Sequence, residues 1–463
     1  MAIFPASAIP SAATTAFTIP YSCRFDDARA TSLSRTPASA GNRQLWTLST
    51  WIKRSKLSAN QYIFSAKANT AGIFFEAGNL IRVEQYDGAG GYDFRRDFNP
   101  MLRDASAWYH MVFIYDSAQV VEADRIKFYL NGEQQSVNYT YNAMASGFES
   151  EFNNTETHWI GTLGTTGLDG YLAETHFINA AAVAPSSFGE TGDYGEWKPI
   201  EVTGLTYSTN GYYLDYADSA DLGDDESGNG NDFAENNIVA SDQMLDTPTN
   251  NFATLNTLQK FVTNTQAPVE GNLKTICGST NTAYKHCIAS TMGVTSGKWY
   301  FEVMIGDTTN SHFSQIGVGN SNIKEFSELL NTTANSGNVP WDGSYGWGYD
   351  AYNGNKEHAN VVASYGSGAS LGDIIGVAID MDNSKIWFSD NGTWIASGDP
   401  AAGTNAAYTN VTGNIIPVVS TQDGSTAFVT MNFGQDSSFA GAKTAQGNGD
   451  YDFYYTPPTG FKA

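Results

Sequence analysis

Alternating apolar and polar positions dominate the chain and predict strands. In residues 46–52, Trp46, Leu48 and Ile52 fall on one face of an extended segment, because side chains alternate along a strand. Asn131-Gly132 is typical of a type I′ hairpin turn between two such segments. The same pattern predicts strands at 62–66, 72–75, 80–86, 108–115, 125–130, 133–137, 158–161 and 170–179. Long helical runs of Ala, Leu, Glu and Lys are missing.

A second strand-rich region begins near residue 272. Its predicted strands are 297–303, 315–319, 345–350, 372–380, 385–388, 414–419 and 429–434. The chain therefore predicts an all-β fold with two antiparallel β-sandwich domains. The expected parts are an N-terminal arm at 1–20, a first sandwich at 21–190, an appendage packed on it at 191–245, a linker at 246–270, a second sandwich at 271–440 and a C-terminal tail at 441–463.

Composition and charge narrow the possible partners. The sequence has 463 residues and 46 glycines, and its 48 acidic and 24 basic side chains give a net charge of −24. A chain so acidic repels the phosphate backbone, which argues against nucleic acid as a partner. No run of about 18 apolar residues exists, so we expect no membrane insertion. The first twenty residues are broken by Pro5, Pro10 and Pro20 and lack the positive start of a signal peptide.

Three cysteines are too few for a disulfide framework. Cys277 and Cys287 can face each other across a hairpin or remain thiols, and the sequence leaves both alternatives open.

The first strand-rich region carries a family resemblance. It shows Trp-Tyr-His-Met-Val-Phe at 108–113, Tyr-Leu-Asn-Gly at 129–132, Trp-Ile-Gly at 159–161 and Leu-Asp-Gly-Tyr-Leu-Ala-Glu-Thr-His-Phe-Ile-Asn at 168–179. In this order and spacing the motifs resemble the laminin-G/concanavalin-like lectin superfamily. The resemblance covers roughly residues 17–190 and implies a jelly-roll sandwich.

The second region resembles a SPRY domain, over roughly residues 270–440. Gly-Lys-Trp-Tyr-Phe-Glu-Val opens it at 297–303, Gly-Asp-Ile-Ile-Gly-Val-Ala-Ile-Asp follows at 372–380, and Asn-Phe-Gly closes it at 432–434. This resemblance implies an antiparallel sandwich that recognises proteins or other ligands.

The remaining segments resemble structural proteins of tailed bacteriophages, especially marine ones. The resemblance is carried by the Asp-Asp-Glu-Ser-Gly-Asn-Gly-Asn-Asp-Phe run at 224–233, by Asp-Thr-Pro-Thr-Asn-Asn-Phe at 246–252, and by the closing Tyr-Thr-Pro-Pro-Thr-Gly-Phe at 455–461. It implies a virion protein that is assembled in the host cytoplasm and exposed on the particle surface.

Candidate catalytic chemistry is sparse. The spaced Glu and Asp motif of concanavalin-like glycosidases is absent, and so are Gly-x-Ser-x-Gly and paired metal-ligand motifs. Glu174 and His176 would share a strand face, but we favour a strand that only closes the sandwich. His110, between apolar residues, is more consistent with a hydrogen-bonded core histidine. We therefore expect no catalytic residues.

Calcium is the one cofactor that the sequence suggests. Carboxylate and amide oxygens on one loop suit this hard cation, although Asp, Asn and Gly also form turns without a metal. The candidate ligands are Asp224, Asp225, Asn229, Asn231 and Asp232.

Aromatic side chains beside glycine-rich turns are candidate sugar platforms, because a ring offers an apolar face to a pyranose. We expect Trp341 and Tyr352 to be exposed at the ends of one run, and Trp347 and Tyr349 to pack inside. The candidate glycan-binding residues are Trp341, Tyr345, Tyr352, Tyr86 and Tyr92.

Together these features predict a non-catalytic phage surface protein, as a tail fibre, a tail tip or a head decoration. Its expected partners are other virion proteins and host surface glycans, and we expect a homo-oligomer, with a trimer as one option. Two alternatives stay open, a tail enzyme that degrades polysaccharide and a purely architectural virion protein.

Overall fold

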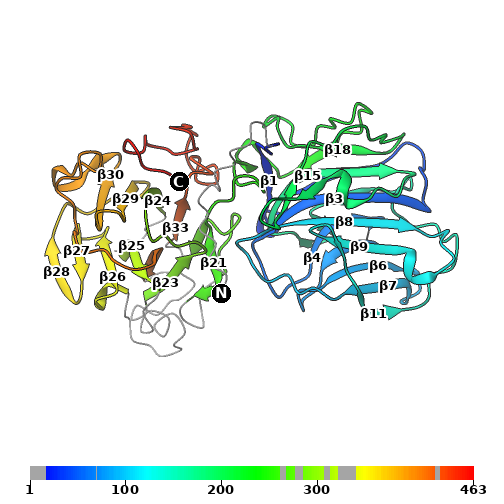
Figure 1. Cartoon of the computed structure of the whole chain (residues 1–463), viewed down its shortest axis with the longest axis horizontal. Helices are drawn as coiled ribbons and strands as arrows, with labels where there is room; N and C mark the ends of the chain where they lie inside the picture. The colour runs from blue at the N-terminus through cyan, green and yellow to red at the C-terminus, as the bar shows by residue number, and fades with distance from the viewer. Residues whose placement is uncertain are drawn as a thin grey trace. The chain divides into compact units, whose positions relative to one another are not determined.

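The computed structural model describes residues 17–68, 70–260, 267–276, 285–306, 313–321, 340–422 and 428–463. These residues form antiparallel strands and short 3-10 helices, which confirms the all-β prediction. The chain divides into two compact units at 251/252, and each is described by itself (Figure 1). No helix among the described residues is long and apolar enough to cross a membrane. The helices are η1 (Asp27–Arg29), η2 (Glu122–Asp124), η3 (Pro185–Ser187), η4 (Ala240–Asp242), η5 (Pro340–Asp342) and η6 (Ile395–Ser397).

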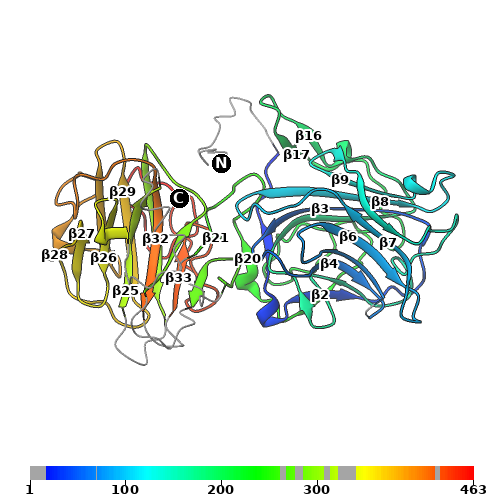
Figure 2. The same ribbon diagram turned by 90° about the horizontal axis from the view of Figure 1, so that it is seen from below.

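Two eight-stranded sheets form the first unit, and Figure 2 shows them as two layers. The β3 sheet contains, in spatial order, β10 (Glu133–Gln134), β9 (Ile126–Leu130), β8 (Trp108–Asp116), β3 (Leu45–Arg54), β15 (Gly170–Asn179), β1 (Ser22–Phe25) and β20 (Gln243–Met244), with β18 (Tyr212–Leu214) paired to β15. The β6 sheet contains β11 (Val137–Tyr141), β7 (Tyr92–Phe98), β6 (Ile81–Tyr86), β5 (Ala71–Phe75), β4 (Gln61–Ala66), β12 (His158–Ile160), β2 (Ser32–Arg35) and β19 (Ala234–Asn236).

Apolar side chains from the inner faces of both sheets form the core of this unit. Trp46 of β3 stacks on Tyr115 of β8 at 5.1 Å between centroids, and it meets the edge of Phe152 at 5.3 Å. Two small hairpins lie outside the sheets, β13 (Thr162–Leu163) with β14 (Thr166–Gly167), and β16 (Gly189–Thr191) with β17 (Trp197–Pro199). Figure 2 shows β16 and β17 on the β8–β9 side of the unit.

The structure adds strands that the pattern did not predict. Strand β7 follows β6 as a hairpin, and β11 leaves the predicted 125–137 hairpin to pair with β7 in the other sheet. Segment 191–245 is more than an appendage, because β18, β19 and β20 extend both sheets. Long-range pairing of this kind leaves little local signal, since strands of two or three residues are too short to show a period.

The boundary falls inside the predicted linker, but part of that segment is structural. Asp246 is fully buried and accepts hydrogen bonds from Lys53 Nζ at 2.6 Å and Trp108 Nε1 at 2.9 Å. Strand β21 (Leu255–Lys260) already belongs to the second unit. At the other end, Ile19 is only 2% exposed, which contradicts a free arm up to residue 20; residues 1–16 lie outside the described residues.

The second unit is also a two-sheet sandwich. One sheet contains β21, β23 (Lys285–Ser290), β32 (Ile415–Gln422), β25 (Phe313–Asn320), β26 (Gly346–Asp350), β27 (Asn355–His358) and β28 (Val361–Ser364). The other contains β22 (Lys274–Ile276), β33 (Phe428–Asn432), β24 (Lys298–Ile305), β29 (Ile374–Asp380), β30 (Lys385–Asp390) and β31 (Thr393–Trp394). Asn391 and Gly392, between β30 and β31, both have positive φ, as a type I′ turn requires.

The predicted C-terminal tail is part of this second sandwich. Glu302 of β24 accepts hydrogen bonds from the backbone N–H groups of Tyr454 and Tyr455 at 2.9 and 2.8 Å. Phe453 and Phe461 pack in one buried cluster with Trp387. The tail therefore covers the outer side of the β24 sheet. Cys287 of β23 is buried, and Cys277 lies outside the described residues, so their pairing stays a prediction.

Candidate functional site

A row of aromatic rings lies on the outer side of the β6 sheet. Ile81 and Val83 of β6 point into the core, so Arg82, Glu84 and Tyr86 point away from it. We call this outer side the tyrosine face. Its aromatic residues are Tyr62, Phe74, Tyr86, Tyr92, Tyr139 and Tyr141.

The rings of the tyrosine face form two groups of contacts, one on β4 and β5 and the other on β6, β7 and β11. Tyr62 stacks on Phe74 at 4.3 Å, and Tyr86 stacks on Tyr92 at 4.4 Å with 3.2 Å between the hydroxyl oxygens. The edge of Tyr141 meets Tyr92 at 5.4 Å. Tyr141 is 42% exposed, so this end of the row is open to solvent. Packed rings lose little entropy on binding and offer a rigid apolar platform.

Two arginines and an aspartate lie beside the rings. Asp97 of β7 accepts hydrogen bonds from Arg82 at 2.7 and 3.1 Å and from Arg95 at 3.1 and 2.6 Å. These arginines lower the pKa of Asp97 despite its partial burial. Arg95 also lies 5.0 Å above the Tyr139 ring. Both guanidinium groups are therefore held by the same carboxylate.

Glu84 is, with Asp97, one of two buried acids on the tyrosine face. Glu84 is 2% exposed, and burial raises its pKa to about 7, opposed by the nearby charges of Arg82 and Arg95 and by a hydrogen bond with Tyr86. Glu84 pairs with Arg95 across the β6–β7 ladder, so Asp97 is its diagonal neighbour. Glu84 is therefore a buried ionisable group with a shifted pKa beside aromatic rings, and such groups are candidates for functional sites.

The predicted pair Tyr86 and Tyr92 lies in this row, at the end of the β6–β7 hairpin. Both side chains are half-buried. Sequence reasoning missed Tyr62, Tyr139, Tyr141 and Glu84. Tyr139 and Tyr141 do alternate within Val137-Asn138-Tyr139-Thr140-Tyr141, but their position beside Tyr92 depends on β11 joining the other sheet.

The expected exposure of Trp341 is wrong. Trp341 is fully buried, and its Nε1 donates to Gln315 Oε1 at 3.2 Å. Gly317 and Gly348 oppose each other on β25 and β26. A Cβ on Gly348 would lie 2.4 Å from Trp341 Cδ2, so the glycines leave the room that this indole fills.

The other aromatic residues of this region follow the prediction more closely. Trp347 and Tyr349 are buried, as expected, and Tyr352 is 44% exposed. Tyr345 is half-buried beside Gly343. With Trp341 inside the core, Tyr345 and Tyr352 have no exposed indole beside them, and their glycan contact stays a prediction.

The predicted calcium residues lie on one loop, held by hydrogen bonds. Asp225 Oδ1 accepts from the N–H groups of Tyr213 and Ser227, and Oδ2 accepts from Ser227 Oγ and Asn231 N–H, at 2.8 to 2.9 Å. These four bonds use the acceptor positions that a carboxylate offers.

The side-chain amides of this loop also form hydrogen bonds. Asn229 and Asn231 each donate to two backbone carbonyls, and Asp232 accepts from the Asp225 N–H at 3.1 Å. The described part of the chain contains no group of three or more His, Cys, Asp or Glu side chains placed to hold a metal. Calcium binding that includes Asp224 stays a prediction, and the contacts explain the loop without it.

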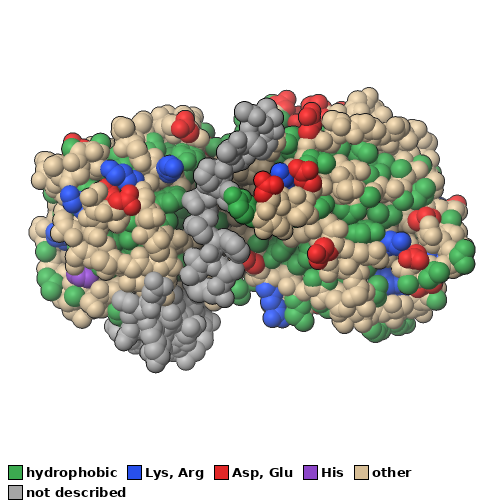
Figure 3. Space-filling view, in the orientation of Figure 1, with side chains coloured by type: hydrophobic (Ala, Val, Ile, Leu, Met, Phe, Trp, Pro, Cys, Tyr) green, Lys and Arg blue, Asp and Glu red, His purple; other side chains and the backbone are tan. Residues whose placement is uncertain are grey.

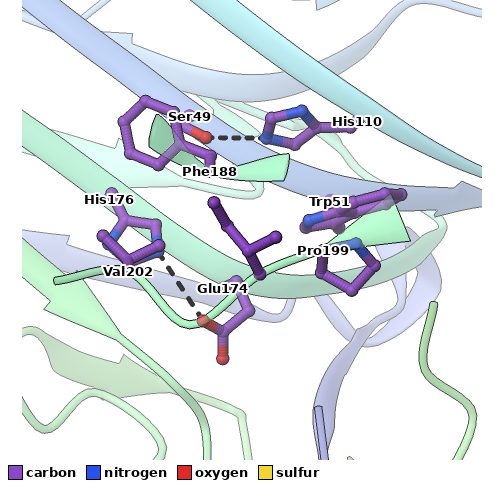
Figure 4. A pocket seen from close by; sticks show the side chains of 9 residues that line it. Ser49, Trp51, His110, Glu174, His176, Phe188, Pro199 and Val202 are labelled. Carbon is purple, nitrogen blue, oxygen red and sulfur yellow. Dashed lines mark hydrogen bonds and ion pairs between the residues drawn. The ribbon is translucent and has the colours of Figure 1, made fainter. Parts of the chain in front are cut away.

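A small pocket on the outer side of the β3 sheet contains Glu174 and His176 (Figure 4). A β-bulge after Ala173, with positive φ at Glu174, places both side chains on this side. His176 Nε2 lies 3.7 Å from Glu174 Oε2, too far for a hydrogen bond. Tyr213 instead donates its hydroxyl to Glu174, 3.0 and 2.8 Å from the two oxygens. Phe188 and Val202 cover the pocket.

Ser49 and His110 form an apparent dyad in the same pocket (Figure 4), 2.9 Å apart. Trp197 Nε1 donates to His110 Nδ1 at 3.0 Å, so His110 carries its proton on Nε2 and donates to Ser49. Burial, followed by the charge of His176, lowers the pKa of His110 to about 3. A histidine that donates to the serine cannot accept its proton, so this dyad is structural.

Charged side chains are dispersed on the face shown in Figure 3. Among the described residues visible there, basic and acidic groups form small separate clusters between uncharged surfaces. This face offers no continuous basic patch for a polyanion.

Comparisons with known proteins match both units. Residues 28–185 match the concanavalin A-like lectin/glucanases superfamily, and residues 298–436 match the SPRY domain family. No curated protein matches the chain. Lectin-like and SPRY domains together support a binding or adhesion module as the class of function.

Three solved structures are similar to part of this chain. The SPRY domain of human HERC1 is 21% identical, with 39% of this chain and 97% of that chain covered and a TM-score of 0.30. A human SPRY domain is 16% identical, with 35% and 91% covered and a TM-score of 0.26. Stonustoxin is 16% identical, with 39% and 27% covered and a TM-score of 0.28.

Proposed function

We propose that this chain is a non-catalytic binding protein of a phage virion surface, and that its first unit holds host glycan on the tyrosine face. The observation that carries the glycan proposal is the packed group of Tyr86, Tyr92 and the exposed Tyr141. A pyranose presents one apolar C–H side, which such rings bury without a covalent step. The match to a lectin-like superfamily supports this use of the sandwich.

The virion part of the proposal is supported by the resemblance of segments 224–233, 246–252 and 455–461 to tailed-phage structural proteins. On a particle, many copies or an oligomer would strengthen a weak single site through effective concentration. The second unit would then contact other virion proteins. Labelling purified particles with an antibody to this chain tests that assignment, and unlabelled particles would refute it.

Two tyrosines test the glycan part. Tyr92→Ala and Tyr141→Ala should each weaken binding on a glycan array by up to about tenfold, because a stacking contact on one ring is worth about 0.5–1.5 kcal/mol. Tyr194→Ala is the matched control, since Tyr194 is 77% exposed in the β16–β17 turn and lies away from the tyrosine face. If the parent binds no glycan, or all three variants bind like the parent, the glycan proposal fails.

Polysaccharide hydrolysis is the second candidate, and one observation favours it. Glu84 has a raised pKa and its diagonal neighbour Asp97 a lowered one, the division that an acid and a base require. Diagonal neighbours lie about 7–8 Å apart, close enough for two side chains to bring their carboxyl groups to a glycosidase-like separation. However, the two arginines donate four hydrogen bonds to Asp97, which leaves it no lone pair to attack or to activate water.

A reducing-end assay separates the two candidates. The parent chain should release no reducing sugar from any polysaccharide that it binds. If the parent releases reducing sugar and Asp97→Asn does not, the chain hydrolyses polysaccharide and the non-catalytic proposal is refuted.

A further inference from the structure

Glu84 lies at the centre of the tyrosine face, between the rings and the arginines. Across the ladder it faces Gly72 of β5 and Arg95 of β7. A Cβ on Gly72 would lie 2.6 Å from Tyr62 Cε1, so the Tyr62 ring covers the glycine beside Glu84. Tyr86 follows on the same side of β6. The carboxyl thus has aromatic neighbours on both sides.

One oxygen of this carboxyl has no hydrogen-bond partner in the described part of the chain. Glu84 Oε2 is buried and unbonded, although Arg82 and Arg95 lie nearby and donate to Asp97 instead. A buried acceptor without a donor costs about 1–3 kcal/mol. Most buried polar groups in proteins are bonded, so the exception requires an explanation.

We infer that Glu84 is the polar anchor of the glycan site, and that its free oxygen accepts a hydrogen bond from a hydroxyl group of an uncharged sugar. This inference rests on the proposed function. The sugar lies on Tyr92 and Tyr141, and it reaches the carboxyl when the half-buried Tyr86 ring turns aside. The ligand then supplies the donor that Oε2 lacks in the described part of the chain.

The charges of the tyrosine face define the ligand class. Glu84 Oε2 lacks a donor among the described residues, and a sugar hydroxyl supplies one, whereas an ionised sugar carboxylate has only acceptors. The two arginines that could bind an anionic sugar already donate to Asp97. Neutral hexoses are therefore the class that this face accepts.

The test compares stability and binding in the full chain. Glu84→Leu keeps the approximate volume and removes the unbonded acceptor, so its melting temperature should equal or exceed that of the parent. Its binding to neutral hexasaccharides of glucose, mannose or N-acetylglucosamine, measured by calorimetry, should fall by about tenfold, the value of one hydrogen bond. A merely structural role predicts the opposite change in stability. Glu133→Leu on β10 is the matched control, because Glu133 is exposed in the other sheet and should leave binding unchanged.

The outcomes separate this inference from the proposed function. If Tyr92→Ala weakens binding while Glu84→Leu binds like the parent, only the role of Glu84 fails. If a hexamer of galacturonate or of glucosamine binds more tightly than every neutral hexamer, the ligand class is wrong. If the parent binds no sugar at all, the proposed function fails and this inference fails with it.

Discussion

Acid should destabilise the first unit through His110, the buried histidine of the β3 sheet. Burial lowers the pKa of His110 to about 3 in the folded protein, whereas an unfolded histidine titrates near about 6.5. Because the folded value is depressed, the unfolded chain binds the proton first. The stability that neutral His110 contributes is present above pH 6.5 and is lost as the pH falls toward 3.

The magnitude follows from the two pKa values. Between pH 7 and pH 5 the unfolded histidine becomes almost fully protonated while the folded one does not, which costs about 2 kcal/mol of the free energy of unfolding. Protonation of His110 in the folded protein is unfavourable because both ring nitrogens already form hydrogen bonds, with Ser49 at 2.9 Å and with Trp197 at 3.0 Å. A second proton on Nδ1 would make this nitrogen a donor, and it would then face another donor, the Trp197 Nε1–H.

Urea denaturation at pH 7 and pH 5 measures this effect by difference. His110→Gln cannot titrate, so between these pH values it should lose about 2 kcal/mol less than the parent. His358→Gln in the second unit is the control and should leave this difference unchanged. Nitrogen-15 spectra should show His110 neutral, with its proton on Nε2, at pH 5. Equal losses in parent and His110→Gln, or a protonated His110 at pH 5, would refute the reasoning.

Three further predictions concern residues whose roles the structure assigns to the fold. Trp341→Ala should lower the stability of the second unit by about 3–5 kcal/mol, measured by denaturation, because it empties a core site, and it should leave glycan binding unchanged. Glu302→Ala removes the acceptor for the Tyr454 and Tyr455 N–H groups, so limited proteolysis should release C-terminal peptides faster than in the parent. Asp225→Ala should lower the free energy of unfolding by about 2–4 kcal/mol through its lost hydrogen bonds, by the same amount in EDTA and in calcium. If calcium stabilises the parent but not Asp225→Ala, the calcium prediction is supported instead.

The sequence by itself determined the fold class and the position of most of the longer strands. Period-two alternation is a local property, so β3, β8, β15, β24 and β29 were predictable from their own residues. Asn131-Gly132 and Asn391-Gly392 were equally predictable, because a type I′ turn depends on the φ angles of its own two residues. Family motifs then identified both sandwiches.

Only the tertiary structure decided which side chains meet. Trp341 and Tyr141 are both aromatic, yet one is fully buried and the other is 42% exposed. Trp341 is buried because two glycines on neighbouring strands leave a space for it, and Tyr141 is exposed because β11 pairs with β7 at a sheet edge. Glu84 is a candidate anchor only because Asp97 holds both neighbouring arginines. Such contacts depend on strand pairing across many residues, and a local pattern of apolar and polar positions contains no information about which strand becomes a neighbour.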